Sequence, residues 1–286
     1  MARAWAMAQL LDGRRRTALA VAAHVVGLQA QDLAAVPWSL RARGAPGDWS
    51  PLVLTWSLRG TRHLHHPDDV GWIVDLVGPA FARPNMRTEE LGVSDRAVAQ
   101  LCEALPLTRP EARAVLAPLD GQAIIHVIRR AALQRRLVVV PGRPERYVAF
   151  PGGGPPPPDD PLAELARRYL LANAPATPAD FSAWSGLPAR GVELAATRLP
   201  STRHPSPLRL LGAFDSLLLG HADRSPVVPP EHARRVNAGG GMIKPVVVSD
   251  GQVVATWRPS TGAVEPFRPL TGAEQAAVEA QLASRS

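Results

Sequence analysis

Apolar residues recur at three- and four-residue spacing in several stretches of the chain, most clearly over residues 94–150. Ser94 is expected to cap a first helix, and Thr108-Arg-Pro-Glu111 to form a capping box for a second. Gly121 separates this second helix from a third that runs to about Arg136. Two apolar runs around a Pro-Gly-Arg-Pro turn, residues 138–140 and 147–150, then predict a β-hairpin. Three helices followed by a hairpin is the order of a winged helix.

In a winged helix the third helix is the one that normally binds DNA. In this chain the third predicted helix and its end carry four arginines: Arg129, Arg130, Arg135 and Arg136. We therefore expect these four side chains to bind DNA.

The segment before this unit predicts both helix and strand. Ser50-Pro51 is typical of a helix start, so residues 52–58 are expected to form a helix that closes at Gly60. Alternating residues predict a short strand over residues 61–66. Pro67 then opens an amphipathic helix that is expected to stop at Gly78-Pro79.

Downstream, residues 151–158 are a linker rich in glycine and proline. Helical patterns that begin near residue 162, at Thr177 and at Pro188 indicate another helix-turn-helix unit, followed by a strand over residues 208–211. Residues 242–249 and 253–257 predict two strands joined across Asp250-Gly251, which is a hairpin signal, and residues 273–282 predict a last helix. The predicted fold class is α+β, with winged-helix units over residues 1–88, 89–151 and 159–206 and a β-rich unit over residues 207–286.

Composition narrows the class of protein. The 286 residues are 46% hydrophobic and 20% charged, and no apolar run is long enough to span a membrane. Without a signal-type hydrophobic block near the amino terminus, we expect a cytoplasmic protein associated with the nucleoid. The single cysteine, Cys102, excludes an internal disulfide framework, disfavours a thiolate zinc site and is expected in the core.

Net charge indicates a polyanionic partner. A formal charge of +7 suits phosphate backbones, because neutralised phosphates release counterions whatever the base sequence. A GC-rich genome explains part of this charge, since arginine is abundant and Lys244 is the only lysine. Chemistry that needs a lysine Schiff base therefore has a single candidate residue, which lies far along the chain from the glutamines described next.

Two carboxamides, Gln29 and Gln31, stand on either side of one alanine, with Asp32 directly behind them. An apolar run at helical spacing leads into this stretch, so the glutamines are expected where a buried helix ends. A carboxamide in or near a core must find partners for its N–H and C=O groups. Two interpretations follow from the residues: a structural clamp, or a pair of groups directed at a ligand.

Three histidines, His63, His65 and His66, fall on the predicted strand. Alternate strand residues share a face, which suits a metal, but no acidic or thiolate companion stands at a useful spacing, so no metal site is expected. Arg59, Thr61 and His63 are candidates for phosphate or sugar contacts. The alternative is a strand edge whose polar groups are satisfied by local hydrogen bonds.

Four motifs in order resemble the AlkZ-like DNA glycosylases. They are Gly-Leu-Gln-Ala-Gln-Asp at 27–32, Leu-Arg-Gly-Thr-Arg-His-Leu at 58–64, Ala-Phe-Asp-Ser-Leu-Leu-Leu-Gly-His-Ala-Asp-Arg at 213–224 and Pro-Glu-His-Ala-Arg-Arg-Val at 230–236. The resemblance implies tandem winged helices forming a curved clamp, a small C-terminal β-barrel, and a Gln-apolar-Gln motif that lines the catalytic centre. Gln29 and Gln31 occupy the two glutamine positions.

The residue type then restricts the substrate. Cleaving an N-glycosidic bond passes through an oxocarbenium-like state, and glutamine can transfer no proton to or from it. A carboxamide can hold a water and place a dipole beside the sugar, which suffices when the base is already cationic. We therefore expect N7-alkylguanine or a related alkylpurine as substrate, with Gln31 positioning the water and Gln29 orienting it or supporting the sugar. Asp32 is a candidate base, with an N-cap or salt bridge as its alternative role.

The function predicted is a monofunctional, cofactor-independent DNA glycosylase that acts as a monomer on double-stranded DNA with alkylated purines. The substrates include bulky natural-product adducts or interstrand crosslinks, in base excision repair or antibiotic self-resistance. The rival hypothesis is a non-catalytic winged-helix DNA-binding protein, either a regulator or a damage binder, in which the glutamines only brace the fold.

Overall fold

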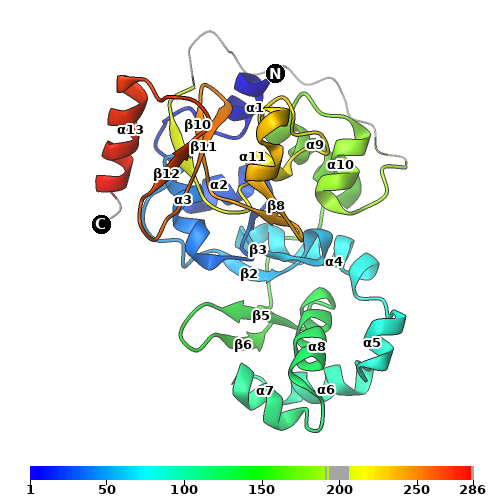
Figure 1. The fold of residues 1–286 in the computed structure, drawn as a ribbon. Helices are drawn as coiled ribbons and strands as arrows, with labels where there is room; N and C mark the ends of the chain where they lie inside the picture. Colours follow the sequence, from blue (N-terminus) through cyan, green and yellow to red (C-terminus); the bar gives the residue numbers. More distant parts are fainter. Residues whose placement is uncertain (191, 193–205, 285–286) are drawn as a thin grey trace.

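The computed structural model describes residues 1–190, 192 and 206–284 (Figure 1). The first third of the chain mixes short helices with three strands. Its elements are α1 (Ala2–Ala8), α2 (Ala18–Val25), β1 (Leu28–Gln29), the 3-10 turn η1 (Leu33–Ala35), α3 (Val36–Ala42), β2 (Val53–Trp56), the 3-10 turn η2 (Leu58–Gly60), β3 (Arg62–His65), α4 (Pro67–Phe81) and α5 (Met86–Glu90).

The middle segment follows the predicted order of three helices and a hairpin. It comprises α6 (Asp95–Glu103), β4 (Leu107–Thr108), α7 (Arg109–Val115), α8 (Gly121–Leu133), β5 (Leu137–Val140) and β6 (Arg146–Ala149). The Ser94 hydroxyl accepts from the backbone N–H of Ala97, and Thr108 and Glu111 form the expected capping box. Both helix starts were therefore predicted correctly from local capping chemistry.

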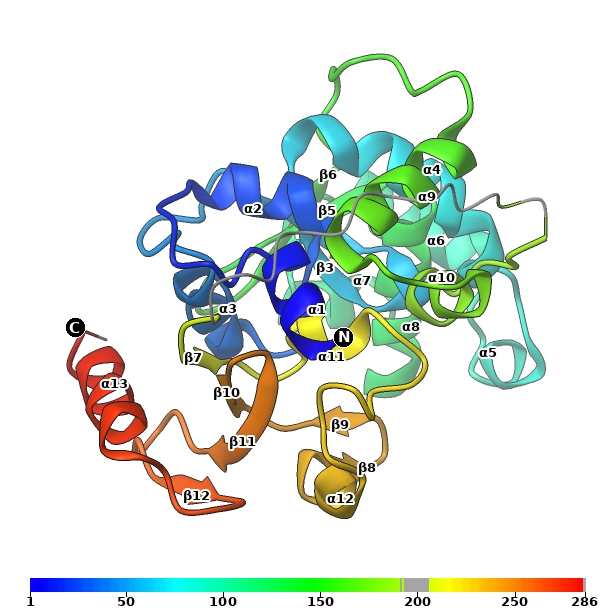
Figure 2. The same ribbon diagram turned by 90° about the horizontal axis from the view of Figure 1, so that it is seen from above.

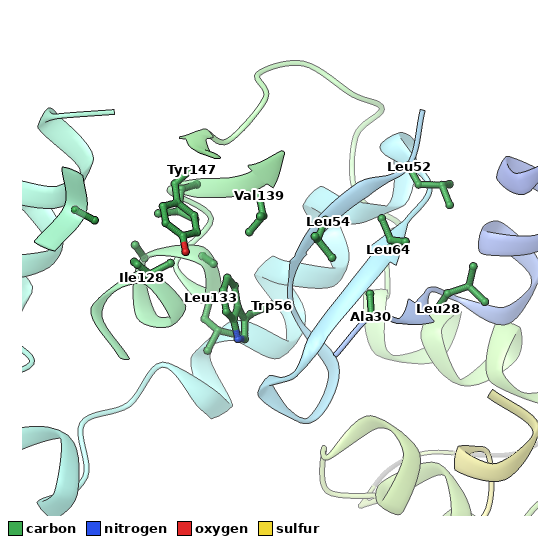
Figure 3. Close-up of a cluster of buried hydrophobic side chains, with 14 of the residues drawn as sticks. Leu28, Ala30, Leu52, Leu54, Trp56, Leu64, Ile128, Leu133, Val139 and Tyr147 are labelled. Carbon is green, nitrogen blue, oxygen red and sulfur yellow. The ribbon is translucent and has the colours of Figure 1, made fainter. Parts of the chain in front are cut away.

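The first and middle segments share one six-stranded sheet, in the order β1-β3-β2-β5-β6-β4. The two halves join where Leu54 on β2 stands opposite Val139 on β5. Figure 3 shows both side chains in the same buried cluster. Residues on either side of position 88 therefore belong to one continuous core, and Cys102 packs against it from a half-buried position.

Two sequence predictions in this region were wrong. Of the helix expected over residues 52–58, residues 53–56 form strand β2 and Leu58 begins the 3-10 turn η2. The strand forms because β2 lies between β3 and β5, where a short apolar run rich in β-branched and aromatic residues pairs on both sides. Helix α4 continues through Gly78-Pro79 to Phe81. A Cβ on Gly78 would lie 2.0 Å from the carbonyl oxygen of Leu133, so this glycine permits helix packing and does not end the helix.

The last part of the chain contains two helices and then a second sheet. Its elements are α9 (Pro161–Asn173), α10 (Pro178–Ser185), β7 (Arg209–Leu211), α11 (Ser216–Leu219), the 3-10 turn η3 (Pro230–His232), α12 (Ala233–Val236), β8 (Asn237–Gly239), β9 (Met242–Ile243), β10 (Val246–Ser249), β11 (Gln252–Trp257), β12 (Val264–Pro266) and α13 (Gly272–Ala283). The helix predicted from Pro188 falls mostly outside the described residues. Figure 2 shows α13 and β12 at one end of the molecule and α5 at the other.

The hairpin across Asp250-Gly251 is confirmed, with both residues at positive φ, 51° and 83°. The single strand expected over residues 242–249 is divided into β9 and β10 at Lys244-Pro245, since proline has no N–H to give to a ladder. The four-stranded sheet runs β12-β11-β10-β7 and has two free edges. The small β-barrel expected here is therefore an open sheet in the described part of the chain.

A buried ion pair joins the parts of the molecule. Arg43 and Asp215 are fully buried, with Nη2 and Oδ1 2.8 Å apart. The Ser39 hydroxyl also donates to Asp215 at 2.7 Å, and Arg43 donates to Oε1 of Gln9 at 2.9 Å. Gln9 in turn donates to Oδ1 of Asn173 on α9 at 2.9 Å. The 213–224 motif, through Asp215, thus connects α1, α3 and α9.

Candidate functional site

The two glutamines follow the end of helix α2. The helix ends at Val26, in the left-handed region (φ 58°), and Gly27 continues at φ 102°. Gly27 has to be glycine, because a Cβ there would lie 2.5 Å from Cε1 of His65. This sharp reversal directs the chain into β1, which pairs antiparallel with β3, so that Gln29 stands opposite His63. The predicted position at the end of a buried helix is confirmed.

Gln29 and Gln31 lie on the same side of the strand. The pairing continues past β1, since Ala30 donates its N–H to the carbonyl of Arg62 at 2.8 Å. Leu28 and Ala30 are buried, whereas Gln29 is half-buried and Gln31 exposed. Because side chains alternate along an extended chain, the two carboxamides project from the face opposite Leu28 and Ala30, and Gln29 shares that face with the buried His63.

Each carboxamide is held through its oxygen. The Arg59 guanidinium donates to Oε1 of Gln29, and the backbone N–H of Arg62 donates to Oε1 of Gln31 at 3.1 Å. Within the described residues neither glutamine NH₂ has a hydrogen-bond partner. The two oxygens therefore have the partners that the clamp interpretation requires, whereas in the described part of the chain the two NH₂ groups have none.

Asp32 is exposed and caps η1, with Oδ1 accepting the N–H of Ala34 at 3.0 Å. This is the N-cap role considered for it from the sequence. The carboxylate nevertheless lies next to Gln31 in the chain and faces solvent, where water can reach it.

Arg59 reaches Gln29 from the tight turn between β2 and β3. Its backbone is left-handed (φ 53°, ψ 14°), and Gly60 donates its N–H to the carbonyl of Ser57 at 2.7 Å. The buried neighbour Leu58 packs into the cluster formed by α4, α9 and α10. Burial, reinforced by the charge of Arg224, lowers the pKa of Arg59 to about 10, so the side chain stays cationic at neutral pH.

His63 and His65 are both buried, and His63 shares one face of the sheet with Gln29, its partner in the β1–β3 pairing. His63 is 2% exposed and donates its Nδ1–H to the carbonyl of Thr61 at 3.1 Å, while His65 Nε2 lies 2.7 Å from the Ser57 hydroxyl. Burial lowers the pKa of His63 well below its usual value, helped by Arg59, and lowers that of His65 to about 4. Both imidazoles are therefore neutral at pH 7, and their hydrogen bonds to Thr61 and Ser57 stabilise the β2–β3 turn.

The remaining residues of this turn are also engaged locally. The half-buried Thr61 donates its hydroxyl to the carbonyl of Leu58 at 3.1 Å. His66 caps α4 by accepting the N–H of Asp68 at 3.2 Å. In the described part of the chain, no group of three or more His, Cys, Asp or Glu side chains is placed to hold a metal ion.

The four arginines near the end of α8 face mostly protein. Arg129 donates to the carbonyl of Gly60 at 2.9 Å, and Arg130 pairs with Asp95 at 2.8 Å. Arg135 pairs with Asp75 at 2.6 Å and lies over the Phe150 ring, and both Arg135 and Arg136 are exposed. Helix α8 packs against both α4 and β2, so its arginines lie where the middle segment contacts the first third of the chain.

Other cations near the site were missed by sequence reasoning. Burial lowers the pKa of His126, and the charges of Arg129 and of Arg87, a residue that the sequence did not single out, lower it further. Arg224 is close enough to Arg59 to lower its pKa. Arg224 ends the 213–224 motif, and that motif was the only signal in the sequence that pointed to it.

Apart from Asp32, the arrangement suits hydrogen bonding and charge, and not proton transfer. The two histidines are neutral and buried, and Asp32 is the one carboxylate next to the glutamines in the sequence. A strand presents two oriented carboxamides beside a cluster of arginines, which is an arrangement for holding a polyanion and a water.

Comparison with known proteins places these features in context. The family model described as DNA glycosylase AlkZ-like matches residues 22–284. A protein of Streptomyces sahachiroi described as an interstrand DNA cross-link repair glycosylase is 28% identical over 320 aligned positions, covering 89% of this chain and 86% of the relative. The solved structure of the S. sahachiroi DNA glycosylase AlkZ superposes with a TM-score of 0.73 at 26% identity, covering 97% of this chain and 94% of that one. In the described residues, no helix is both long and apolar enough to cross a membrane.

Proposed function

Because the chain belongs to the AlkZ-like DNA glycosylase family, we propose that it hydrolyses the N-glycosidic bond of an N7-alkylated guanine in double-stranded DNA and stops at the abasic site. The observation that carries this proposal is the pair Gln29 and Gln31, whose oxygens are both held, with the buried and neutral His63 opposite Gln29. The single lysine, Lys244, supports a monofunctional reaction, because a lyase step needs an amine nucleophile.

The substrate class follows from what carboxamides can do. An undamaged purine leaves only if an acid protonates it, and no such acid is oriented toward the glutamines. N7-alkylation makes the guanine cationic, so the bond is already activated before binding. Gln31 is then the residue that positions the water, through the second lone pair of its oxygen, while the sugar develops positive charge.

Asp32 is proposed to assist in this step. Its carboxylate is exposed and uses one oxygen for capping, so the other can take up the proton that the water loses. An Asp32→Asn variant keeps the cap, because the amide oxygen still accepts the N–H of Ala34. It therefore tests the charge of Asp32 separately from its structural role.

The DNA-binding surface is proposed to run from this site along the basic side chains next to it. Residues 94–150 have the helix and hairpin order of a winged helix, which supports a tandem winged-helix protein whose units together contact the duplex. Arg129 binds the carbonyl of Gly60 in the turn that carries Arg59 and Thr61, and both Arg87 and Arg129 act on His126. The crosslink named for the relative suggests that bulky N7 adducts and interstrand crosslinks are substrates of this chain as well.

The proposal is tested by base release. The purified chain is incubated with duplexes carrying N7-methylguanine, a bulky N7 adduct or no lesion, and free base and alkali-labile sites are measured. Release from a lesion, with none from undamaged DNA, is expected. Binding to DNA without release from either lesion identifies a regulator or damage binder and refutes the glycosylase.

A further inference from the structure

We propose that Arg59 positions Gln29 and fixes its carboxamide as a hydrogen-bond donor toward the DNA. This inference rests on the proposed function for its effect on catalysis, but the contact itself can be tested without activity. Arg59 would then not be a phosphate contact, although it was a candidate for one from the sequence.

The chemistry of the partner decides the orientation of Gln29. A guanidinium has N–H donors and no acceptor, so the end of the carboxamide that faces it has to be the oxygen. The NH₂ end then points away from Arg59, and no described group accepts from it. The NH₂ group of Gln29 is therefore free to donate its two N–H hydrogen bonds to a ligand.

The two glutamines differ in the charge of the group that binds their side-chain oxygen. The oxygen of Gln29 is bound by a cation, which cancels its negative dipole beside a positively charged sugar or base. The oxygen of Gln31 is bound only by a neutral backbone N–H and keeps its second lone pair. Gln29 is thus suited to an acceptor of the substrate, such as a phosphate or sugar oxygen, and Gln31 to the water.

Arg59 itself is held firmly enough to act as a positioning residue. A second N–H group donates to the carbonyl of Trp184 on α10, and the turn is tied to α8 by the bond from Arg129 to Gly60. A Cβ on Gly60 would lie 2.1 Å from Nη2 of Arg129, which shows how closely α8 approaches. The orientation of Gln29 therefore depends on contacts from two other parts of the fold.

The positioning role is tested by NMR on protein with ¹⁵N-labelled glutamine side chains, in which the Gln29 resonance is identified by its loss in Gln29→Ala. Arg59→Gly removes the guanidinium and suits the left-handed backbone, so the fold should be retained; Arg59→Lys is the second variant. The Gln29 NH₂ resonance should shift in both. Arg113→Ala, an exposed arginine on α7, removes the same charge and should leave it unchanged.

Single-turnover base release and DNA affinity test the consequence. Arg59→Gly should slow release on the order of 100-fold, and the double variant with Gln29→Ala should be no slower than Gln29→Ala alone. Gln29→Glu keeps the contact with Arg59 but has no N–H, so it should lose activity, whereas Gln31→Glu should retain it. DNA affinity and its salt dependence should change little.

Several results overturn the inference. An unchanged Gln29 resonance in Arg59→Gly refutes positioning, whatever the activity. A salt slope of binding lower by about 0.9 in Arg59→Gly identifies Arg59 as a phosphate contact, and wild-type activity in Gln29→Glu refutes the donor role. If the wild-type chain releases no base while the resonance shifts, the positioning role stands and the proposed function fails.

Discussion

Gln29 ends strand β1 and Gln31 lies two residues further along the chain, but their surroundings differ. Gln29 is half-buried and held by a cation, whereas Gln31 is exposed and held by the backbone. The sequence identified the pair and its place after a helix, because both follow from local patterns. It did not predict the contact with Arg59, which lies thirty residues away and is brought in by a strand pairing.

At the residue scale, His65 predicts how stability depends on pH. Burial lowers its folded-state pKa to about 4, so the unfolded chain binds the proton more tightly. Stability is then lost as pH falls from about 6.5 to about 4, by about 3 kcal/mol for this one group. Urea unfolding at pH 7 and pH 4 measures the loss. In His65→Gln, which cannot be protonated, the loss should be smaller by a similar amount; an unchanged loss would exclude His65 as its source.

At the element scale, the strand pairings are what local patterns did not predict. The helix start signal at Ser50-Pro51 predicted a helix over residues 52–58. Strand β2 forms there because it pairs with β3 on one side and with β5 on the other. The capping signals at Ser94 and Thr108 were reliable, since a cap depends on residues three positions apart. Non-local pairing therefore accounts for the errors, and local hydrogen bonding for the correct predictions.

The turn at Gly27 provides a prediction at this scale. Gly27→Ala should destabilise the fold by about 2 kcal/mol or more, because a Cβ both opposes the positive φ and contacts the His65 ring at 2.5 Å. Gly47→Ala is the matched control: its φ is 115°, with nothing within 4 Å of the added Cβ. Thermal and urea unfolding of both variants separate the clash from backbone strain. Equal losses would mean that the contact with His65 contributes nothing.

At the scale of the whole molecule, one buried network connects segments that are far apart in sequence. The 213–224 motif was recognised from its residues, but no local pattern showed that Asp215 pairs with Arg43. The sequence also did not predict the shared six-stranded sheet, since residues 1–88 and 89–151 were expected to form separate units. The open C-terminal sheet differs from the expected barrel because β12 and β7 have no strand between them.

Breaking this network should affect the entire fold. Asp215→Ala leaves the Arg43 cation buried without its partner and is expected to cost about 3–5 kcal/mol in unfolding free energy. Glu265→Ala removes an exposed partner of Arg258 and should leave stability nearly unchanged. Chemical denaturation compares the two. A small loss in Asp215→Ala would show that the junction is held by other contacts.

The central claim is that the two carboxamides carry out base release while the basic surface around them binds DNA. The most direct test is the single-turnover rate of free-base release from an N7-methylguanine duplex, measured with DNA affinity and unfolding free energy for the wild-type chain and Gln31→Ala. The structure predicts a rate lower by about 100-fold with affinity and stability nearly unchanged, since Gln31 is exposed on the strand. Equal rates for the two proteins, or a lower rate that merely follows lost stability, would contradict it.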